Sequence, residues 1–327
     1  MQNKIYIFGA GTNGAMALRA CKKHGISVVA FLDNFTEKTV FHELPVLRPA
    51  EGDRNIPVVV TSPVFCLDIT LQLDWLGFTS RNLSMFYHEL GIEPDWAGDL
   101  KNNRKEYERT RAMLGDARSI AVFDAVMKFR KTLEPLYPAA VKTDLGRQWF
   151  DRDFFVPGPH VFVDGGGYNG DTAEEFIRQC PAYRSVYVFE PSRELFNASA
   201  DRLGAKRDVR IFNHGLSDKM VQCHLEDAGL PGGRVGVSGE KISLLPLDTL
   251  DIEQPTFIKL DIEGCEKEAI RGAGGHIRRG KPFLAVAVYH KPEDIWEIPR
   301  LLSGMQNYKF YLRHYTQFYH ETVLYAV

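Results

Sequence analysis

Three charged residues alternate with apolar ones in the segment FIKLDIE. Because successive side chains of a strand point to opposite faces, Lys259, Asp261 and Glu263 are expected to share one face. Charges inside a parallel sheet are costly unless they lie at the carboxyl end of a strand, where ligands bind. His290 ends another apolar segment, FLAVAVYH. We therefore predict Asp261, Glu263 and His290 as catalytic residues, with His290 or Asp261 as a general base that takes a proton from a hydroxyl.

These charged residues also have structural interpretations. Lys259 can serve simply as the ion-pair partner of the two acids, and a lone histidine is more often structural than catalytic. Glu266 falls on the first turn of the next expected helix, where an acid is a routine partner of the helix dipole. Two carboxylates on one strand are weak grounds for a divalent metal, so no metal site is predicted.

A glycine-rich turn follows the short apolar segment VFV. Gly165, Gly167 and Gly170 keep the GxGxxG spacing, Asp164 precedes them, and a helix is expected after Asp171. Glycines allow a tight turn and a close approach by a ligand, and the helix N-terminus offers unpaired N–H groups. An acid here would repel the phosphates of a dinucleotide, whereas S-adenosylmethionine has no phosphate but carries an ammonium, a sulfonium and a ribose.

S-adenosylmethionine is therefore the predicted cofactor. Glu190 ends the next strand-like segment, where its carboxylate can accept hydrogen bonds from both ribose hydroxyls. Asp218 follows the third segment and can accept a hydrogen bond from the adenine amino group. The alternative is a glycine turn with a purely structural role, in which Asp164 caps the helix. The predicted cofactor-binding residues are Asp164, Gly165, Gly166, Gly167, Asn169, Gly170, Asp171, Glu190, Pro191, Ser217, Asp218 and Asp261.

A second glycine turn, IFGAGTNG, lies near the N-terminus. It also keeps the GxGxxG spacing through Gly9, Gly11 and Gly14, and Asp33 ends the next strand nineteen positions later. No acid precedes its first glycine, so by spacing it is the better dinucleotide fingerprint of the two. Two interpretations stay open. Either these four residues form a second nucleotide site, or the domain kept the fold and lost the ligand or serves as a docking surface.

The elements around the two turns predict an α/β protein with two Rossmann-like domains. Residues 1–95 and 156–327 each alternate strands with helices, which implies parallel sheets with right-handed crossovers. Residues 96–155 have helical periodicity and are expected to form a helical connector. The last two strand-like segments, YKFYLRHY and ETVLYAV, have no helix between them, so they predict an antiparallel hairpin at the sheet edge.

Composition excludes several classes of partner and site. The chain has 327 residues, 44% of them hydrophobic, which suits two domains, and its net charge of -2 favours neither a nucleic-acid nor a membrane partner. No apolar run reaches the roughly 18 residues of a membrane helix, and no signal-peptide core precedes the first glycines. The five cysteines form no CxxC pair, which argues against a zinc site or a disulfide framework and favours the cytoplasm.

From about residue 140 to 327, the chain resembles the FkbM family of S-adenosylmethionine-dependent methyltransferases. The resemblance implies a seven-stranded class I methyltransferase fold and O-methylation, typically of sugar or natural-product hydroxyls. Gly166 departs from the family pattern, in which alanine is common at the middle position. The marks are WFD at 149–151, VDGGGYNGD at 163–171, FEP at 189–191, KLDIEGCE at 259–266, KP at 281–282, VYH at 288–290 and the closing ETVLYAV.

The predicted function is methyl transfer to a hydroxyl of a sugar or glycosylated small molecule, with a nucleotide-sugar among the acceptors considered. One alternative is an NAD-dependent sugar oxidoreductase or epimerase that uses the N-terminal turn, although no YxxxK pair follows that turn. Another is a non-enzymatic nucleotide-binding protein. Four aromatic residues before the cofactor strand either stack on a sugar or pack in the core: Trp149, Phe150, Phe154 and Phe155. The acceptor and the oligomeric state are not fixed by the sequence.

Overall fold

The computed structural model describes residues 4–92, 94–226, 234–236 and 238–327. Contacts divide the chain into two compact units. Unit 1 comprises residues 1–98, 124–142 and 315–320, and unit 2 comprises residues 99–123, 143–314 and 321–327. The segment predicted as a connector is thus shared between the units, and the domain boundaries at 95 and 155 stay predictions. None of the described helices is both long and apolar enough to cross a membrane.

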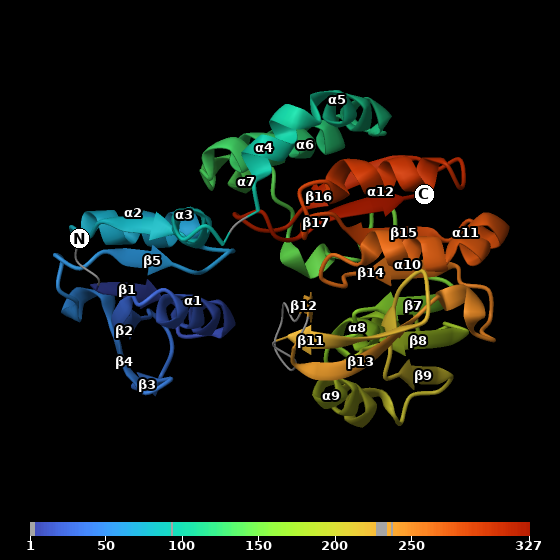
Figure 1. Cartoon of the computed structure of the whole chain (residues 1–327), viewed down its shortest axis with the longest axis horizontal. Helices are drawn as coiled ribbons and strands as arrows, with labels where there is room; N and C mark the ends of the chain where they lie inside the picture. Colours follow the sequence, from blue (N-terminus) through green and yellow to red (C-terminus); the bar gives the residue numbers. More distant parts are fainter. Residues whose placement is uncertain (1–3, 93, 227–233, 237) are drawn as a thin grey trace. The chain divides into compact units, whose positions relative to one another are not determined.

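Unit 1 contains a six-stranded sheet in the order β3-β4-β2-β1-β5-β6 (Figure 1). All neighbouring strands are parallel except β3 and β4. The apolar runs IYIF and VVV are fully buried in β1 and β5, which explains why both strands could be predicted. The elements are β1 (Lys4–Phe8), α1 (Thr12–Lys23), β2 (Ser27–Leu32), β3 (Val40–Phe41), β4 (Leu44–Leu47), η1 (Pro49–Glu51), β5 (Val58–Val60), α2 (Cys66–Trp75), β6 (Ser80–Asn82) and α3 (Leu83–Glu89).

Unit 2 contains a seven-stranded sheet in the order β16-β17-β15-β14-β7-β8-β9. The central strands are parallel, and β17 runs antiparallel to both β15 and β16, which confirms the predicted terminal hairpin (Figure 1). The predicted α/β fold class with a seven-stranded methyltransferase sheet is confirmed. The strands are β7 (Val161–Gly165), β8 (Ser185–Phe189), β9 (Val209–Phe212), β14 (Phe257–Leu260), β15 (Phe283–Ala287), β16 (Phe310–His314) and β17 (Thr322–Ala326).

Helices follow most of these strands, as their sequence periodicity predicted. Within unit 2, α8 packs against α9, and α12 packs against both α10 and α5. The segment 96–155 is largely helical, in agreement with the prediction. The described helices of the chain after α3, some of which lie wholly or partly in unit 1, are α4 (Trp96–Asn102), α5 (Arg104–Met113), α6 (Ala117–Thr132), α7 (Leu136–Ala139), η2 (Leu145–Arg147), α8 (Asp171–Gln179), α9 (Arg193–Leu203), η3 (Leu247–Thr249), α10 (Glu266–Gly272), α11 (Gly274–Gly280) and α12 (Asp294–Ser303).

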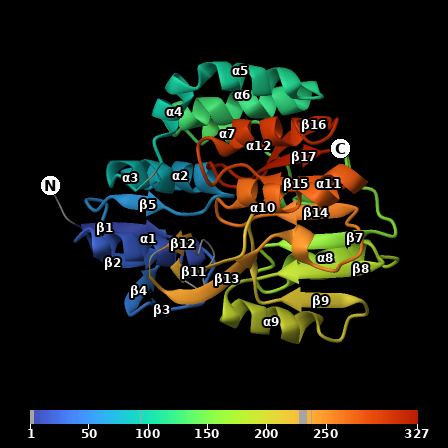
Figure 2. The same ribbon diagram turned by 45° about the vertical axis from the view of Figure 1, so that its right-hand side comes forward.

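A second, four-stranded sheet lies in the chain between β9 and β14 and was not predicted. Its order is β10-β13-β11-β12, and Figure 2 shows β11 and β13 side by side. Apolar and polar residues are mixed in these strands, and among the described side chains Leu225, Ile242 and Leu244 form a small buried cluster. The strands are β10 (Gly215–Leu216), β11 (Val221–Glu226), β12 (Arg234–Gly236) and β13 (Glu240–Leu245).

The aromatic segment before β7 belongs largely to the core of unit 2. Phe150 and Phe155 are buried, and Phe150 contacts the rings of Phe162 and Phe176. Phe154 stacks on Tyr311 with 4.6 Å between ring centroids. The three phenylalanines therefore pack within the protein and are not placed to stack on a sugar, whereas Trp149 lies at the cavity described next.

Candidate functional site

A cavity of about 280 Å³ in unit 2 brings together the carboxyl ends of β7, β8 and β14. This is the edge of a parallel sheet where ligands are expected to bind. Of the residues predicted for the cofactor or for catalysis, six line the cavity. These are Gly166, Asp171, Glu190, Pro191, Asp261 and Glu263; the wall also includes Gln148, Trp149, Tyr168, Thr172, Leu195, Gly215, Leu216, Leu225, Ile242, Leu244, Lys259, Ile262, Cys265 and Glu321.

The glycine turn leaves no room for a side chain at its middle position. Gly166 has φ +78°, and a Cβ there would lie 1.9 Å from the carbonyl oxygen of Asp261. Gly170 has φ +83° and forms the N-cap of α8. Gly166 departs from the alanine common in the resembled family, and the close backbone approach explains why glycine is needed in this chain.

Glu190 is held at the wall of the cavity by the backbone of the turn. Its Oε2 accepts a hydrogen bond from the Tyr168 N–H, and its Oε1 accepts one from the Ser192 N–H, both at 2.9 Å. The side chain is buried. Burial raises the pKa of Glu190 to about 7, although the two backbone hydrogen bonds act in the opposite direction.

Asp164 and Lys259 form a buried ion pair beneath the same turn. The Lys259 Nζ lies 2.9 Å from Asp164 Oδ1 and donates hydrogen bonds to the carbonyls of Gly165 and Gly166. Burial alone would lower the pKa of Lys259, but the carboxylates of Asp164 and Asp261 raise it above its ordinary value. Asp164 is not among the described residues that line the cavity, so it supports the turn from below.

The predicted catalytic residues lie together, and Glu266 joins them. His290 Nε2 lies 3.5 Å from Asp261 Oδ1 and 3.4 Å from Glu263 Oε2, and His290 Nδ1 lies 2.9 Å from Glu266 Oε1. Glu266 was expected only to complement the helix dipole, but its side chain is fully buried and also accepts a hydrogen bond from the Ile262 N–H. Burial alone would lower the pKa of His290, but the carboxylates, Glu266 foremost, raise it to about 10.

A second group of polar residues on the wall was missed by sequence reasoning. The Tyr289 hydroxyl donates to Asp261 Oδ1 at 3.0 Å and lies 3.4 Å from Glu321 Oε2. The Gln148 amide donates to Glu321 as well. Burial, followed by the charge of Asp261, raises the pKa of Glu321 to about 7. The available signal was a lone acid directly before the apolar strand TVLYA.

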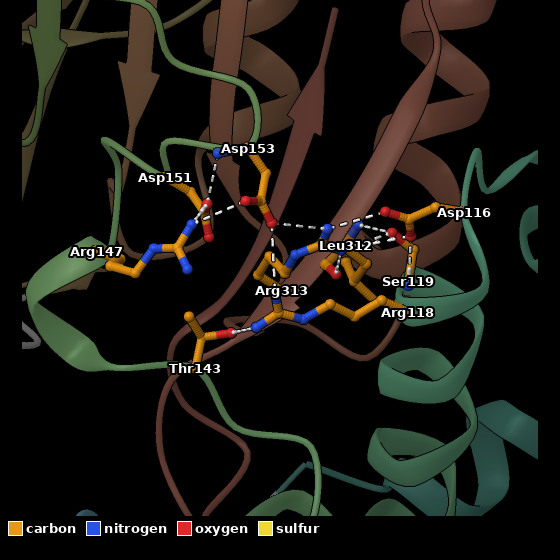
Figure 3. Close-up of polar contacts among 9 residues, drawn as sticks. All are labelled: Asp116, Arg118, Ser119, Thr143, Arg147, Asp151, Asp153, Leu312 and Arg313. Atoms are coloured by element: carbon orange, nitrogen blue, oxygen red, sulfur yellow. Dashed lines mark hydrogen bonds and ion pairs between the residues drawn. The ribbon is translucent and has the colours of Figure 1, made fainter.

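The loop that carries Gln148 and Trp149 is fixed by a buried arginine. Arg313 on β16 contacts Asp116 at 2.9 Å and Asp153 at 3.4 Å (Figure 3). Arg147 in turn pairs with Asp153 at 3.0 Å. Trp149 itself has φ +70°, and the Lys259 ammonium lies 5.2 Å from the centre of its ring. These contacts hold Trp149 against the cavity.

Several predicted cofactor residues lie near the cavity without being part of its described lining. Ser217 is buried, and its N–H donates to the Leu245 carbonyl, while Gly215 and Leu216 of β10 form the wall instead. Asp218 lies beside Ser217, with 3.5 Å between the Ser217 Oγ and an Asp218 oxygen. Asn169 accepts from the Asp171 N–H. The adenine contact assigned to Asp218 stays a prediction.

Unit 1 has a cavity of its own, of about 570 Å³, at the N-terminal glycine turn. Gly9, Gly11, Gly14 and Asp33 all line it, so the four residues predicted for a second nucleotide site are brought together. The Asp33 carboxylate accepts hydrogen bonds from the N–H groups of Ala10, Phe35 and Thr36. It therefore braces the loop that forms the wall.

The fold is similar to the crystal structure of methyltransferase FkbM from Methylobacillus flagellatus KT, with a TM-score of 0.77 and 22% sequence identity over 100% of this chain and 90% of that chain. Precorrin-6y C5,15-methyltransferase from Geobacter metallireducens GS-15 has a TM-score of 0.35 and 13% identity, over 52% of this chain and 80% of that one, which is too weak to bear on the site. No curated protein sequence matches the chain significantly.

One family model matches a part of the chain that contains most of the cavity. The match, to the methyltransferase FkbM domain, covers residues 164–316. That range includes the glycine turn, Glu190, the segment from Lys259 to Glu266 and His290. This part of the chain is therefore similar to the methyltransferase FkbM domain.

Proposed function

We propose that unit 2 binds S-adenosylmethionine in its cavity and transfers the methyl group to a hydroxyl oxygen of a small molecule. The observation that carries this proposal is the Glu190 carboxylate, which two backbone N–H groups hold at the cavity wall. A carboxylate has about four acceptor positions, so the remaining ones are available to ribose hydroxyls. At Gly166, where a Cβ would meet the Asp261 carbonyl, the glycine turn packs closely against the segment that carries Asp261, so two parts of the cavity wall are held together.

The acids around the cavity fit a cofactor with positive charge. S-adenosylmethionine supplies a methyl group on a sulfonium, which is a good leaving group. The protein then has to align the acceptor hydroxyl and take its proton. Asp261 and Glu321 are carboxylates on the wall, joined through the Tyr289 hydroxyl, and we propose them as proton acceptors. His290 has carboxylates at both ring nitrogens, so its proposed role is to position Asp261 and Glu263.

The proposed acceptor is a sugar or a glycosylated small molecule. Three hydrogen-bonding side chains, Gln148, Glu263 and Glu321, line the same cavity as Trp149. Carboxylates and amides that accept from several hydroxyls, beside an aromatic ring, suit a polyol. O-methylation of sugar hydroxyls is also what the family resemblance implies.

The cavity of unit 1 favours a second candidate function. Its glycine turn and the exposed rings of Phe35 and Phe65 lie in one cavity, which suits a nucleotide with a base between aromatic faces. On this basis, Gly9, Gly11 and Gly14 would contact the ligand. The candidate functions are an NAD-dependent sugar oxidoreductase or epimerase, or nucleotide binding without catalysis.

Calorimetric titration with S-adenosylhomocysteine, followed on the same sample by NAD and a nucleotide-sugar, tests both candidates. Saturable binding of one S-adenosylhomocysteine per chain, weakened at least tenfold by Glu190→Gln, is the expected result. Tight binding of NAD with no binding of S-adenosylhomocysteine would instead place the active centre in unit 1. The matched control is Glu194→Gln, which changes an acid on the first turn of α9 outside the described cavity lining.

A further inference from the structure

Three carboxylates surround one imidazole beside the cavity of unit 2. The ligand atoms of Asp261, Glu266 and His290 all lie within 4.8 Å of one another. Glu263 Oε2 lies 3.4 Å from His290 Nε2 on the side of the ring that faces Asp261. We propose that this cluster of Asp261, Glu263, Glu266 and His290 binds a divalent cation of the Mg²⁺ or Mn²⁺ class, a site that the sequence did not predict.

The cluster has a surplus of negative charge. Within the described part of the chain, His290 is the only cationic side chain at ion-pair distance from Asp261 or Glu266. Glu266 is fully buried, and its Oε2 has no hydrogen-bond partner among the described residues. A buried carboxylate oxygen without a donor is costly, and a cation in the cluster would offset that cost.

The distances around His290 are close to those of ligands that share an ion. Nε2 lies 3.4–3.5 Å from the oxygens of Asp261 and Glu263, which exceeds an N–H···O hydrogen bond of about 2.7–3.2 Å. Two ligands on one ion, with bonds of about 2.1 Å, are separated by roughly 3.0–3.4 Å. Glu266 Oε1 lies 2.9 Å from the other ring nitrogen, where a carboxylate typically orients a metal-binding histidine, which leaves Oε2 as the oxygen that Glu266 would offer to the ion.

The donor set also selects the kind of ion. Several carboxylate oxygens with a single imidazole suit Mg²⁺ and Mn²⁺, whereas zinc and copper sites usually contain more nitrogen or sulfur ligands. Asp261 and Glu263 line the cavity, so the ion would lie at its wall. A hydroxyl that coordinates such an ion loses its proton more readily, and Glu321 would then remain to take that proton.

Metal binding can be measured on the full chain without cofactor or acceptor. After treatment with EDTA and removal of the chelator, the protein is titrated with MnCl₂, with bound Mn²⁺ followed by calorimetry and by loss of the free-ion electron paramagnetic resonance signal. We expect one ion per chain, competition by Mg²⁺, and at least tenfold weaker binding in Asp261→Asn and in His290→Gln. Glu268→Gln, on the same helix as Glu266 but paired with Arg271, should bind like the wild type.

Two results would overturn the site: no saturable Mn²⁺ binding at millimolar concentration in folded wild-type protein, or equal affinity in the wild type, Asp261→Asn and His290→Gln. Because the wild type alone gives a decisive answer, a variant that fails to fold does not weaken the test. Titration of the same sample with S-adenosylhomocysteine separates this proposal from the proposed function. Binding of the cofactor product without Mn²⁺ binding rejects only the metal site, and the reverse rejects only the cofactor site.

Discussion

The Lys259 ammonium lies 2.9 Å from the Asp164 carboxylate, and both side chains are almost completely buried. The parallel register of β14 and β7 places the two residues opposite each other. Lys259 also donates to the carbonyls of Gly165 and Gly166. The charge pair thus links β14, which Asp261 directly follows, to the glycine turn, so that two walls of the cavity are held in one arrangement.

Replacement of Lys259 by Met should strongly destabilise unit 2. The Asp164 carboxylate would stay buried without its partner, which typically costs about 3–5 kcal/mol. Adding Asp164→Asn removes that unpaired charge and should restore part of the loss. Urea unfolding, read from the transition that S-adenosylhomocysteine shifts, measures the change. Lys241→Met, at an exposed position on β13, is the control, and a Lys259→Met protein as stable as this control would contradict the structural role.

The sequence predicts the main sheet well because its central strands are buried on both faces. FIKL and FLAVA are almost wholly buried in β14 and β15, and runs of this kind are easily recognised. The β10–β13 sheet lacks this signal because β11 and β13 mix buried residues with half-buried and exposed ones. Gln148 and Glu321 are 173 positions apart, so their contact depends on the fold rather than on any local pattern.

The role of Glu266 shows the same limit. Its position on the first turn of a helix favours a dipole partner, which is true of most acids there. Only the fold brings its carboxylate to His290, which lies three residues after the end of β15, and buries it. Similarly, Asp164 was predicted to contact the cofactor. In the structure Asp164 is buried and forms an ion pair with Lys259, and this pairing depends on the neighbouring strand β14.

Gly166→Ala should abolish cofactor binding or reduce it by more than tenfold. The new Cβ would lie 1.9 Å from the Asp261 carbonyl, and φ +78° is unfavourable for alanine. The turn would have to move away from β14, which disturbs the wall of the cavity. Titration with S-adenosylhomocysteine measures the loss. Gly304→Ala, at the end of α12 with ordinary contacts to a new Cβ, should bind normally, and equal affinities in the two variants would contradict this account.

Cofactor affinity should increase with pH through about 7, where Glu190 titrates. The carboxylate form accepts the ribose hydrogen bonds, so protonation of Glu190 competes with binding. If only the carboxylate binds, affinity falls about tenfold for each pH unit below the pKa. Titrations with S-adenosylhomocysteine between pH 5.5 and 8.5, values chosen to bracket that pKa by roughly 1.5 units on each side, would follow this change.

The raised pKa of Glu190 has a second consequence, for the protein without cofactor. The folded state binds the proton of the Glu190 carboxyl more tightly than the unfolded state does. The contribution of Glu190 therefore makes the apo-protein less stable as the pH rises from the ordinary pKa of a glutamate towards 7. Glu190→Gln should remove both this trend and the pH dependence of binding. A variant that retains the full pH dependence of affinity would show that another group is responsible.

Glu321→Gln should lower turnover while leaving cofactor affinity almost unchanged. Glu321 is half-buried on the cavity wall and linked through Tyr289 to Asp261, and loss of a proton acceptor typically costs about 10²–10⁴-fold in rate. Gln148 and Tyr289 can still bond to the amide, so the wall should keep its shape. Transfer of a labelled methyl group to a sugar acceptor gives kcat, and titration gives the affinity for S-adenosylhomocysteine. Glu108→Gln, in an exposed pair on α5, is the control. Turnover equal to that of the control would exclude Glu321 as the proton acceptor and leave Asp261 in that role.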